Sequence, residues 1–321
     1  FSGKEILVPI DGQHRLAAID FAINGRDESQ KPLDFKSNME VAEDDVTVIL
    51  LKHNDVNVRK IFNKVNRYAK PTTRAENLIT SDDDVIAVIT REMVDNFSRE
   101  EVNPNQKVIS PRLVNFKSNT LNASTHYFTT LNTLYMGSKY IIEVGSQQGK
   151  VNETDIGRYA PKKELWTKEV IKEWKTLLDG IDDFSVALSY QEQDGDEARK
   201  DYRKVSLLGR PIGQLMLMMT YISFKTLPNK NGGTDSIDKI LLKLNQVDWS
   251  LNNRIWERVM VNAGRMVSGI TALRFGARWT HYLAGGYHDT AKKEALKNDY
   301  LVLFPEDERA DVVKEFPEPF V

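Results

Sequence analysis

The chain has 321 residues, of which 40% are hydrophobic and 28% are charged, so it is long enough for one large domain or two ordinary ones and can bury a core. It contains no cysteine, which excludes disulfides, thiolate zinc sites and a cysteine nucleophile and fits a reducing compartment. Its 44 Lys and Arg residues nearly balance 46 Asp and Glu residues, for a formal net charge of −2, so any nucleic-acid contact has to come from a local basic surface.

The chain opens with a strand-like pattern followed by a helical one. Residues 4–10 form a short β-branched run that predicts a strand, and Asp11-Gly12 predicts the turn that ends it. Leu16, Ile19 and Ile23 then share one helical stripe, and Asn24-Gly25 predicts the helix end. Because the sequence begins inside the strand-like pattern, we expect a further segment upstream of Phe1.

A second strand and helix follow. Residues 46–53 are short, continuous and β-branched, which predicts a buried strand. Residues 57–69 have helical spacing, and Pro71 stops that helix. From about residue 82 the spacing is helical almost throughout, in 82–97, 118–144, 167–181, 206–224 and 252–283.

We therefore predict an α+β protein with two parts. A small α/β module occupies residues 1–80 and a larger, all-helical domain occupies residues 81–321. Residues 286–321 are charged and contain three prolines, which indicates a peripheral C-terminal extension. No apolar run is long enough to span a membrane, and we see no secretory signal, so we expect a cytoplasmic protein.

The turn after the first strand carries the strongest chemical signal. Asp11 is placed to cap the following helix, and Gly12 permits a tight turn. The first helical N–H groups then face outward beside the positive end of the helix dipole, which suits an anion. Gln13, His14 and Arg15 stand on that first turn, and the Arg15 fork can bind phosphate. Asp11 could instead hold magnesium or orient Arg15, and an ordinary capped helix with a solvated arginine is a further alternative.

Two motifs together resemble a known family. Residues 10–19, IDGQHRLAAI, resemble the motif that names the DGQHR-domain family, and residues 61–72, IFNKVNRYAKPT, resemble its companion pattern. The companion positions here are Phe62, Asn66, Arg67, Lys70, Pro71 and Thr72. Looser likeness to the DndB-like members runs through residues 110–135 and 247–259, so the resemblance covers most of the chain.

The resemblance implies both a fold and a function. The wider DGQHR group is similar to the ParB/sulfiredoxin-like fold, whose members bind and often hydrolyse nucleotides, so the N-terminal module is expected to be ParB-like. DndB-like proteins are associated with DNA phosphorothioate modification, where members act as DNA-binding regulators of the transcription of the modification genes. Similar proteins accompany 7-deazaguanine modification of DNA, where an NTPase role is suggested. The sequence leaves open which of the two systems this chain serves.

A nucleotide site follows from combining the two motifs. Asn66 and Lys70 lie four residues apart at a helix end and face the same side. An asparagine oxygen can ligate Mg²⁺ and a lysine can neutralise a phosphate. The candidate set for Mg²⁺ and a nucleoside triphosphate is therefore Gly12, Arg15, Asn66 and Lys70 for the phosphates, Asn66 for the metal, and Asp11, Gln13 and His14 for catalysis.

The sequence departs from the family pattern after Pro71, where residues 72–84 replace the usual Ser-rich run. This leaves Asp82, Asp83 and Asp84 either as metal ligands or as the acidic start of the next helix, and we favour the helix start. Residues 209–214, GRPIGQ, lack the spacing of a dinucleotide-binding loop and predict a turn before a helix over 213–224. The five tryptophans are interpreted as helical core.

One candidate DNA-binding surface remains. If residues 251–267 form a continuous helix, Arg254, Arg258 and Arg265 lie within about 40° of one another and could follow a phosphate backbone; the alternative is a solvated face paired with local acids. Three functions stay open: a DNA-binding regulator or accessory factor with a phosphate site, an NTPase that drives a DNA-modification complex, and a non-catalytic scaffold. The expected partners are DNA and other DNA-modification proteins, and homo-oligomer formation is left open.

Overall fold

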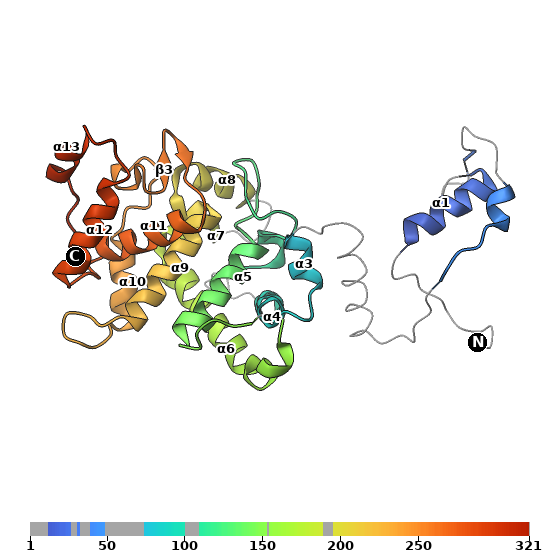
Figure 1. Cartoon of the computed structure of the whole chain (residues 1–321), viewed down its shortest axis with the longest axis horizontal. Coiled ribbons are helices and arrows are strands. Elements are labelled where there is room, and N and C mark those ends of the chain that lie inside the picture. The colour runs from blue at the N-terminus through green and yellow to red at the C-terminus, as the bar shows by residue number, and fades with distance from the viewer. Residues whose placement is uncertain are drawn as a thin grey trace. The chain divides into compact units, whose positions relative to one another are not determined.

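The computed structural model describes residues 12–26, 31–32, 39–48, 74–99, 109–152, 154–188 and 195–320. The chain divides into two compact units, residues 1–72 and 73–321, and each is treated by itself below. Helices predominate in both described parts (Figure 1), and the strands that the structure describes are short pairs in the second unit.

In the first unit, residues 13–24 form the helix that the sequence predicts. Helix α1 (Gln13–Asn24) follows Gly12, whose φ is 84°, and ends at Gly25, whose φ is 61°. The N–H of Gly25 donates to the carbonyl oxygen of Phe21 over 2.8 Å, which closes the last turn. Glycine adopts these left-handed conformations without the Cβ clash of other residues, so the helix end predicted at Asn24-Gly25 is confirmed, while the N-cap is Gly12 and not the predicted Asp11. The short 3-10 helix η1 (Met39–Glu43) lies against α1.

Most other predictions for the first unit fall outside the described residues. This is true of the strand over 4–10, the helix over 57–69 and the ParB-like character of the module. Of the strand predicted over 46–53, residues 46–48 are described; they form no strand, and Val46 and Val48 are 58% and 64% exposed. A buried strand is therefore wrong for these three residues, because no described strand pairs with their backbone or covers their side chains.

The second unit is built mainly from helices joined by short turns. Its helices are α3 (Arg74–Thr80), α4 (Val85–Arg99), α5 (Leu131–Tyr140), α6 (Ile156–Gly180), α7 (Ser185–Leu188), α8 (Asp196–Val205), α9 (Pro211–Thr226), α10 (Ile237–Asn245), α11 (Ile270–Leu283), α12 (Thr290–Leu301) and α13 (Arg309–Lys314). Single turns of 3-10 or π helix are η2 (Pro111–Leu113), η3 (Ile141–Gly145), η4 (Asp182–Phe184), η6 (Leu207–Gly209) and η7 (Arg254–Trp256).

Helix α9 is central to this unit. It packs against α11, α5 and α10 (Figure 1), and Met216, Leu217 and Tyr221 on it are at most 1% exposed. The approach of α11 depends on Gly276, since a Cβ there would lie 2.6 Å from the sulfur of Met216. Helix α4 packs separately against α5 and α6. The apolar faces of these helices together form one core.

The tryptophans belong to this core, as the sequence predicts. Each of the five is at most 4% exposed. The ring of Trp249 stacks on that of Trp256 with centroids 5.6 Å apart, and the ring of Trp279 stacks on that of Tyr300 with centroids 4.4 Å apart. The indole N–H of Trp279 donates to the carbonyl oxygen of Ile255 over 2.9 Å. The interpretation of these residues as core is confirmed.

The second unit is not all-helical, which corrects one prediction. Strands β1 (Val114–Asn115) and β2 (Thr129–Thr130) pair in parallel, and strands β3 (Val261–Asn262) and β4 (Arg265–Met266) pair antiparallel. The β3–β4 hairpin interrupts the continuous helix predicted over 251–267. Its two-residue loop, Ala263-Gly264, has φ values of 48° and 72°, the doubly left-handed pair that joins hairpin strands.

The segment predicted as a C-terminal extension, residues 286–321, packs on the core over its described part. In α12, Leu296 is fully buried and Tyr300 is 6% exposed. The hydroxyl of Tyr282 donates to the carbonyl oxygen of Pro317 over 2.9 Å, and the N–H of Phe320 donates to the carbonyl oxygen of Leu283 over 2.8 Å. These bonds hold the described C-terminal residues against the end of α11.

Candidate functional site

The turn that opens α1 has the geometry of an anion site. Gly12 occupies the N-cap position and makes no side-chain hydrogen bond, and the first turn holds no acidic residue. A Cβ added to Gly12 would meet no heavy atom of the described residues within 4 Å, so these residues leave space beside the turn. Gln13 and Arg15 are both exposed on this turn. The first N–H groups of a helix lack intrahelical acceptors and carry the positive end of its dipole, so the turn can receive a phosphate.

The other half of the predicted nucleotide site is not among the described residues. Asn66 and Lys70 lie outside them, as do Asp11 and the side chain of His14. The N-cap position belongs to Gly12, one residue later than the cap predicted at Asp11. A meeting of the two motifs in one cleft therefore stays a prediction. Within the described ranges, no group of three or more His, Cys, Asp or Glu side chains could hold a metal ion.

The acidic run before α4 serves that helix. Asp84 accepts hydrogen bonds at Oδ1 from the N–H groups of Ile86 and Ala87, at 2.9 and 3.0 Å. Asp82 forms an ion pair with Arg91 over 2.8 Å. An aspartate in this position satisfies helix N–H groups that have no intrahelical acceptor. The interpretation of these acids as a helix start is confirmed for Asp84.

The three arginines proposed for DNA do not share a helical face. Arg254 is in η7, Arg265 is in β4, and Arg258 lies between them with a φ of 60°. Arg258 pairs with Glu308 over 3.1 Å, and its guanidinium lies 4.9 Å from the ring centroid of Phe304. The helical geometry is therefore wrong, because the hairpin turns the chain between them. Arg254 and Arg265 are exposed, and contact of these arginines with DNA stays a prediction.

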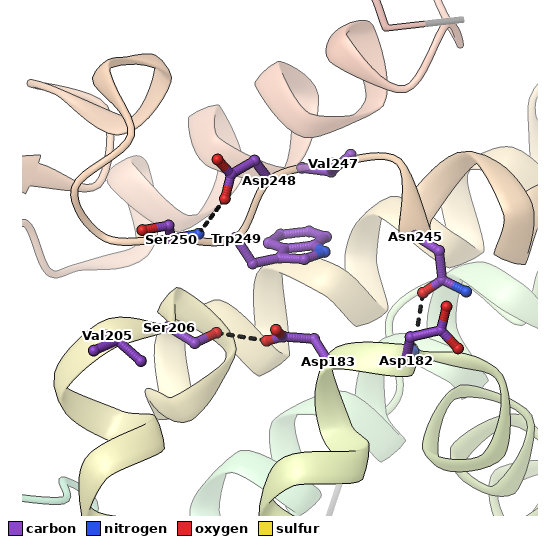
Figure 2. Close-up of a pocket in the computed structure, with 9 residues that line it drawn as sticks. All are labelled: Asp182, Asp183, Val205, Ser206, Asn245, Val247, Asp248, Trp249 and Ser250. Carbon is purple, nitrogen blue, oxygen red and sulfur yellow. Dashed lines mark hydrogen bonds between the residues drawn. The ribbon is translucent and has the colours of Figure 1, made fainter.

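A pocket of about 320 Å³ opens in the second unit, and no residue predicted as functional is among those that line it (Figure 2). Three segments meet there: η4, the end of α8, and the chain that follows α10. We call it the acidic pocket, and its lining residues are Asp182, Asp183, Val205, Ser206, Asn245, Val247, Asp248, Trp249 and Ser250. The lining contains three carboxylates and no Lys, Arg or His.

Hydrogen bonds fix two of the three carboxylates of the acidic pocket. Asp183 accepts at Oδ2 from the hydroxyls of Tyr202 and Ser206, each over 2.6 Å. Burial, together with the Asp183 charge, raises the pKa of Tyr202 well above its usual value, so Tyr202 stays a neutral donor. Asp248 accepts from the N–H of Ser250 over 2.8 Å, and the N–H of Asp182 donates to the side chain of Asn245 over 3.0 Å (Figure 2).

The chemistry of the acidic pocket favours a cation over an anion. Three carboxylates without a lysine or arginine among them repel phosphate. The Trp249 ring lines the same pocket, and an indole face attracts cations. The acidic pocket is therefore a poor candidate for contact with a DNA backbone.

A second polar region of opposite charge lies on α8. We call it the arginine cluster: Arg112, Arg199, Arg203 and Arg210, with the carboxylate of Asp196. Arg199 and Arg203 are each 1% exposed. Arg203 donates to three backbone carbonyl oxygens, from Nε to Gly209 over 3.2 Å, from Nη1 to Thr125 over 2.5 Å and from Nη2 to Tyr127.

One carboxylate serves two of these arginines. Asp196 accepts from Arg199 over 2.7 Å and from Arg112 over 3.2 Å. Burial works to raise the pKa of Asp196, but the Arg199 hydrogen bond and the Arg112 charge outweigh it and hold that pKa below its usual range. Burial, and after it the charges of Arg210 and Arg199, lower the pKa of Arg203 to about 10, so it remains charged at neutral pH.

Neither the acidic pocket nor the arginine cluster was predicted from the sequence. The one available signal for the arginine cluster is the spacing of Arg199 and Arg203, since residues four apart share a helix face. Residues 209–214, GRPIGQ, were interpreted as a turn before a helix over 213–224; the helix is confirmed, but α9 begins at Pro211, two residues earlier, so only Gly209 and Arg210 precede it. The acidic pocket had no signal, because its three segments lie far apart in the sequence.

The described structure defines a predominantly helical protein with two polar regions of opposite charge, and none of its described helices is long and apolar enough to cross a membrane. Residues 2–282 match the family model for DndB, DNA-sulfur modification-associated. The chain belongs to this DndB family, which confirms the resemblance to DndB-like proteins seen in the sequence. Membership connects the protein with DNA and with the other proteins of DNA-sulfur modification. No match was found among curated proteins or among solved structures.

Proposed function

We propose that this chain acts in DNA-sulfur modification as a DNA-binding regulator or accessory factor, with a phosphate site at the turn that opens α1. The observation that carries the proposal is the geometry of Gly12. Its left-handed φ of 84° starts the helix without a capping side chain, and the described residues leave space beside it. Family membership supplies the DNA-modification context.

The chemistry of the turn supports a phosphate as its ligand. A phosphate placed beside the first N–H groups of α1 gains hydrogen bonds and the favourable end of the helix dipole. The exposed guanidinium of Arg15 offers two parallel donors to the same group. Because Arg15 is exposed, its replacement removes a ligand contact at little cost in packing.

The experiment compares Arg15→Ala with the wild type in binding to ATP with Mg²⁺ and to duplex DNA. Loss of a charge-assisted hydrogen bond costs about 1.5–3 kcal/mol, so we expect affinity for the true ligand to fall roughly ten- to a hundred-fold. Calorimetry measures the nucleotide and fluorescence anisotropy the DNA. The matched control is Arg26→Ala, since Arg26 is exposed in the same unit but follows the other end of α1.

The outcomes separate the candidate functions. Equal affinities of the Arg15→Ala and Arg26→Ala variants for every phosphate compound would refute the phosphate site. A wild type that binds duplex DNA without hydrolysing ATP fits the regulator. Magnesium-dependent ATP hydrolysis would instead favour the NTPase, with Asn66 and Lys70 as the next residues to replace. Absence of all binding would leave the scaffold.

A further inference from the structure

The arginine cluster carries more positive charge than its own residues balance. Among the described residues, it holds four guanidinium groups and the carboxylate of Asp196, and neither Arg203 nor Arg210 is paired with a described carboxylate. Arg199 and Arg203 are buried, and Arg199 and Arg210 both lie close enough to Arg203 to lower its pKa. Charges removed from water are costly unless they are paired. A bound anion would relieve this repulsion.

Arg210 differs from the two buried arginines in its hydrogen bonding. Arg203 uses all three of its guanidinium nitrogens on carbonyl oxygens. The Nε of Arg210 is buried, and among the described residues no acceptor lies within hydrogen-bond distance of it. The Arg210 side chain as a whole is half-buried, so the rest of the guanidinium is reachable from solvent. Buried polar atoms in native proteins nearly always have a partner, and this missing partner points to a ligand.

The start of α9 adds two further groups at the same place. Arg210 is the N-cap residue of this sixteen-residue helix, and the first turn contains no acidic side chain. Gln214, which is 1% exposed, donates from Nε2 to the carbonyl oxygen of Leu208 over 3.1 Å, while its buried Oε1 has no donor among the described residues. The start of α9 therefore has the Arg210 donor to spare for an oxyanion, and the Gln214 oxygen accepts from a donor such as water.

We propose that the arginine cluster is a binding site for a phosphate group, with Arg210 as its direct contact. Arg112, whose side chain is 36% exposed, joins the cluster through its ion pair with Asp196. Arg199 and Arg203 supply fixed positive charge behind the site. The phosphate can come from the backbone of DNA, which rests on the proposed function, or from a free phosphate compound, which does not. This site belongs to the second unit and is distinct from the turn of α1 in the first.

The test uses the full chain with Arg210→Gln, which removes the charge, and Arg210→Lys, which keeps it. The matched control is Arg278→Gln, because Arg278 is a partly exposed arginine of the same unit that pairs with Asp299 over 2.6 Å. Duplex DNA binding is measured across a range of salt concentrations. Inorganic phosphate is tested by its effect on the melting temperature, against chloride at the same ionic strength.

If the ligand is DNA, Arg210→Gln should flatten the slope of log affinity against log salt by about 0.9, one phosphate contact, while Arg210→Lys and Arg278→Gln keep it. If the ligand is a free phosphate compound, phosphate should raise the melting temperature of the wild type and of Arg210→Lys but not of Arg210→Gln. An Arg210→Gln variant that matches Arg278→Gln in both assays would overturn the proposal, and normal DNA binding in that variant would leave the proposed function intact. A wild type that binds no DNA but is stabilised by phosphate through Arg210 would support the phosphate site and contradict the DNA binding of the proposed function.

Discussion

Helix α8 contributes side chains to both the acidic pocket and the arginine cluster, which differ in how far their charges are exposed to water. Tyr202 on one face, with Ser206 just beyond the helix, donates hydroxyl protons to Asp183 in the acidic pocket. Arg199 and Arg203, four residues apart on another face, donate to backbone carbonyl oxygens from the 125–127 segment. The pocket leaves its charge open to water, whereas the cluster encloses much of its charge in protein.

This difference separates the hydrogen bonds that stabilise the fold from the charges that remain available to a ligand. The carbonyl oxygens that surround Arg203 satisfy its hydrogen bonds but carry no charge, so they tie distant segments together and leave its net charge in place. The carboxylates at the rim of the pocket remain hydrated and contribute little to folding. Substitutions in the cluster should therefore act mainly on stability, except at Arg210, and substitutions at the pocket rim should hardly affect it.

The largest effect is expected for Arg203→Met. This change removes the Arg203 donor from the carbonyl oxygens of Thr125, Tyr127 and Gly209, and each such loss costs about 1–3 kcal/mol. Allowing for relaxation, we expect a loss on the order of 3–5 kcal/mol, measured by urea unfolding. The neighbouring Lys204→Met is the control, because the Lys204 side chain is 57% exposed. A loss of unfolding free energy as small as that of the control would show that the Arg203 hydrogen bonds to the 125–127 segment do not stabilise the fold.

An intermediate effect is expected for Asp183→Asn. The neutral amide can still accept a hydrogen bond, but the two hydroxyl donors lose a charged acceptor, which we expect to cost about 1–2 kcal/mol. The double variant with Tyr202→Phe provides the control. If Asp183 acts through Tyr202, the sum of the losses of unfolding free energy in the two single variants should exceed the loss in the double variant. Strict additivity would contradict the coupling.

The smallest effect is expected for Asp182→Asn at the exposed rim of the acidic pocket. Its side chain forms no hydrogen bond with other described residues, and surface substitutions of this kind stay within about 0.5 kcal/mol. Its N–H, which donates to Asn245, is unchanged. Thermal unfolding of the Asp182→Asn and Asp183→Asn variants, measured in parallel, checks that Asp182→Asn loses less stability. A loss that equals that of Asp183→Asn would remove the distinction between rim and anchor.

Features that depend on neighbours in the chain could be predicted from the sequence. Gly12 and Gly25 mark the limits of α1, because only glycine takes the left-handed backbone cheaply. Asp84 caps α4 because its side chain reaches N–H groups two and three residues ahead. The paired motifs identified the family without any structure. All of these signals are local, or lie in the order of motifs along the chain.

The hairpin at 261–266 and the two charged regions could not be predicted from the sequence and became visible only in the tertiary structure. Helical spacing of Arg254, Arg258 and Arg265 carried no information about the left-handed turn at Ala263-Gly264, which breaks the predicted helix. The acceptors of Arg203 lie 76 and 78 residues away in the sequence, and the acidic pocket joins segments more than sixty residues apart. Such groups meet because core packing brings their helices together, and hydrophobic spacing specifies which faces are buried but not which faces become neighbours.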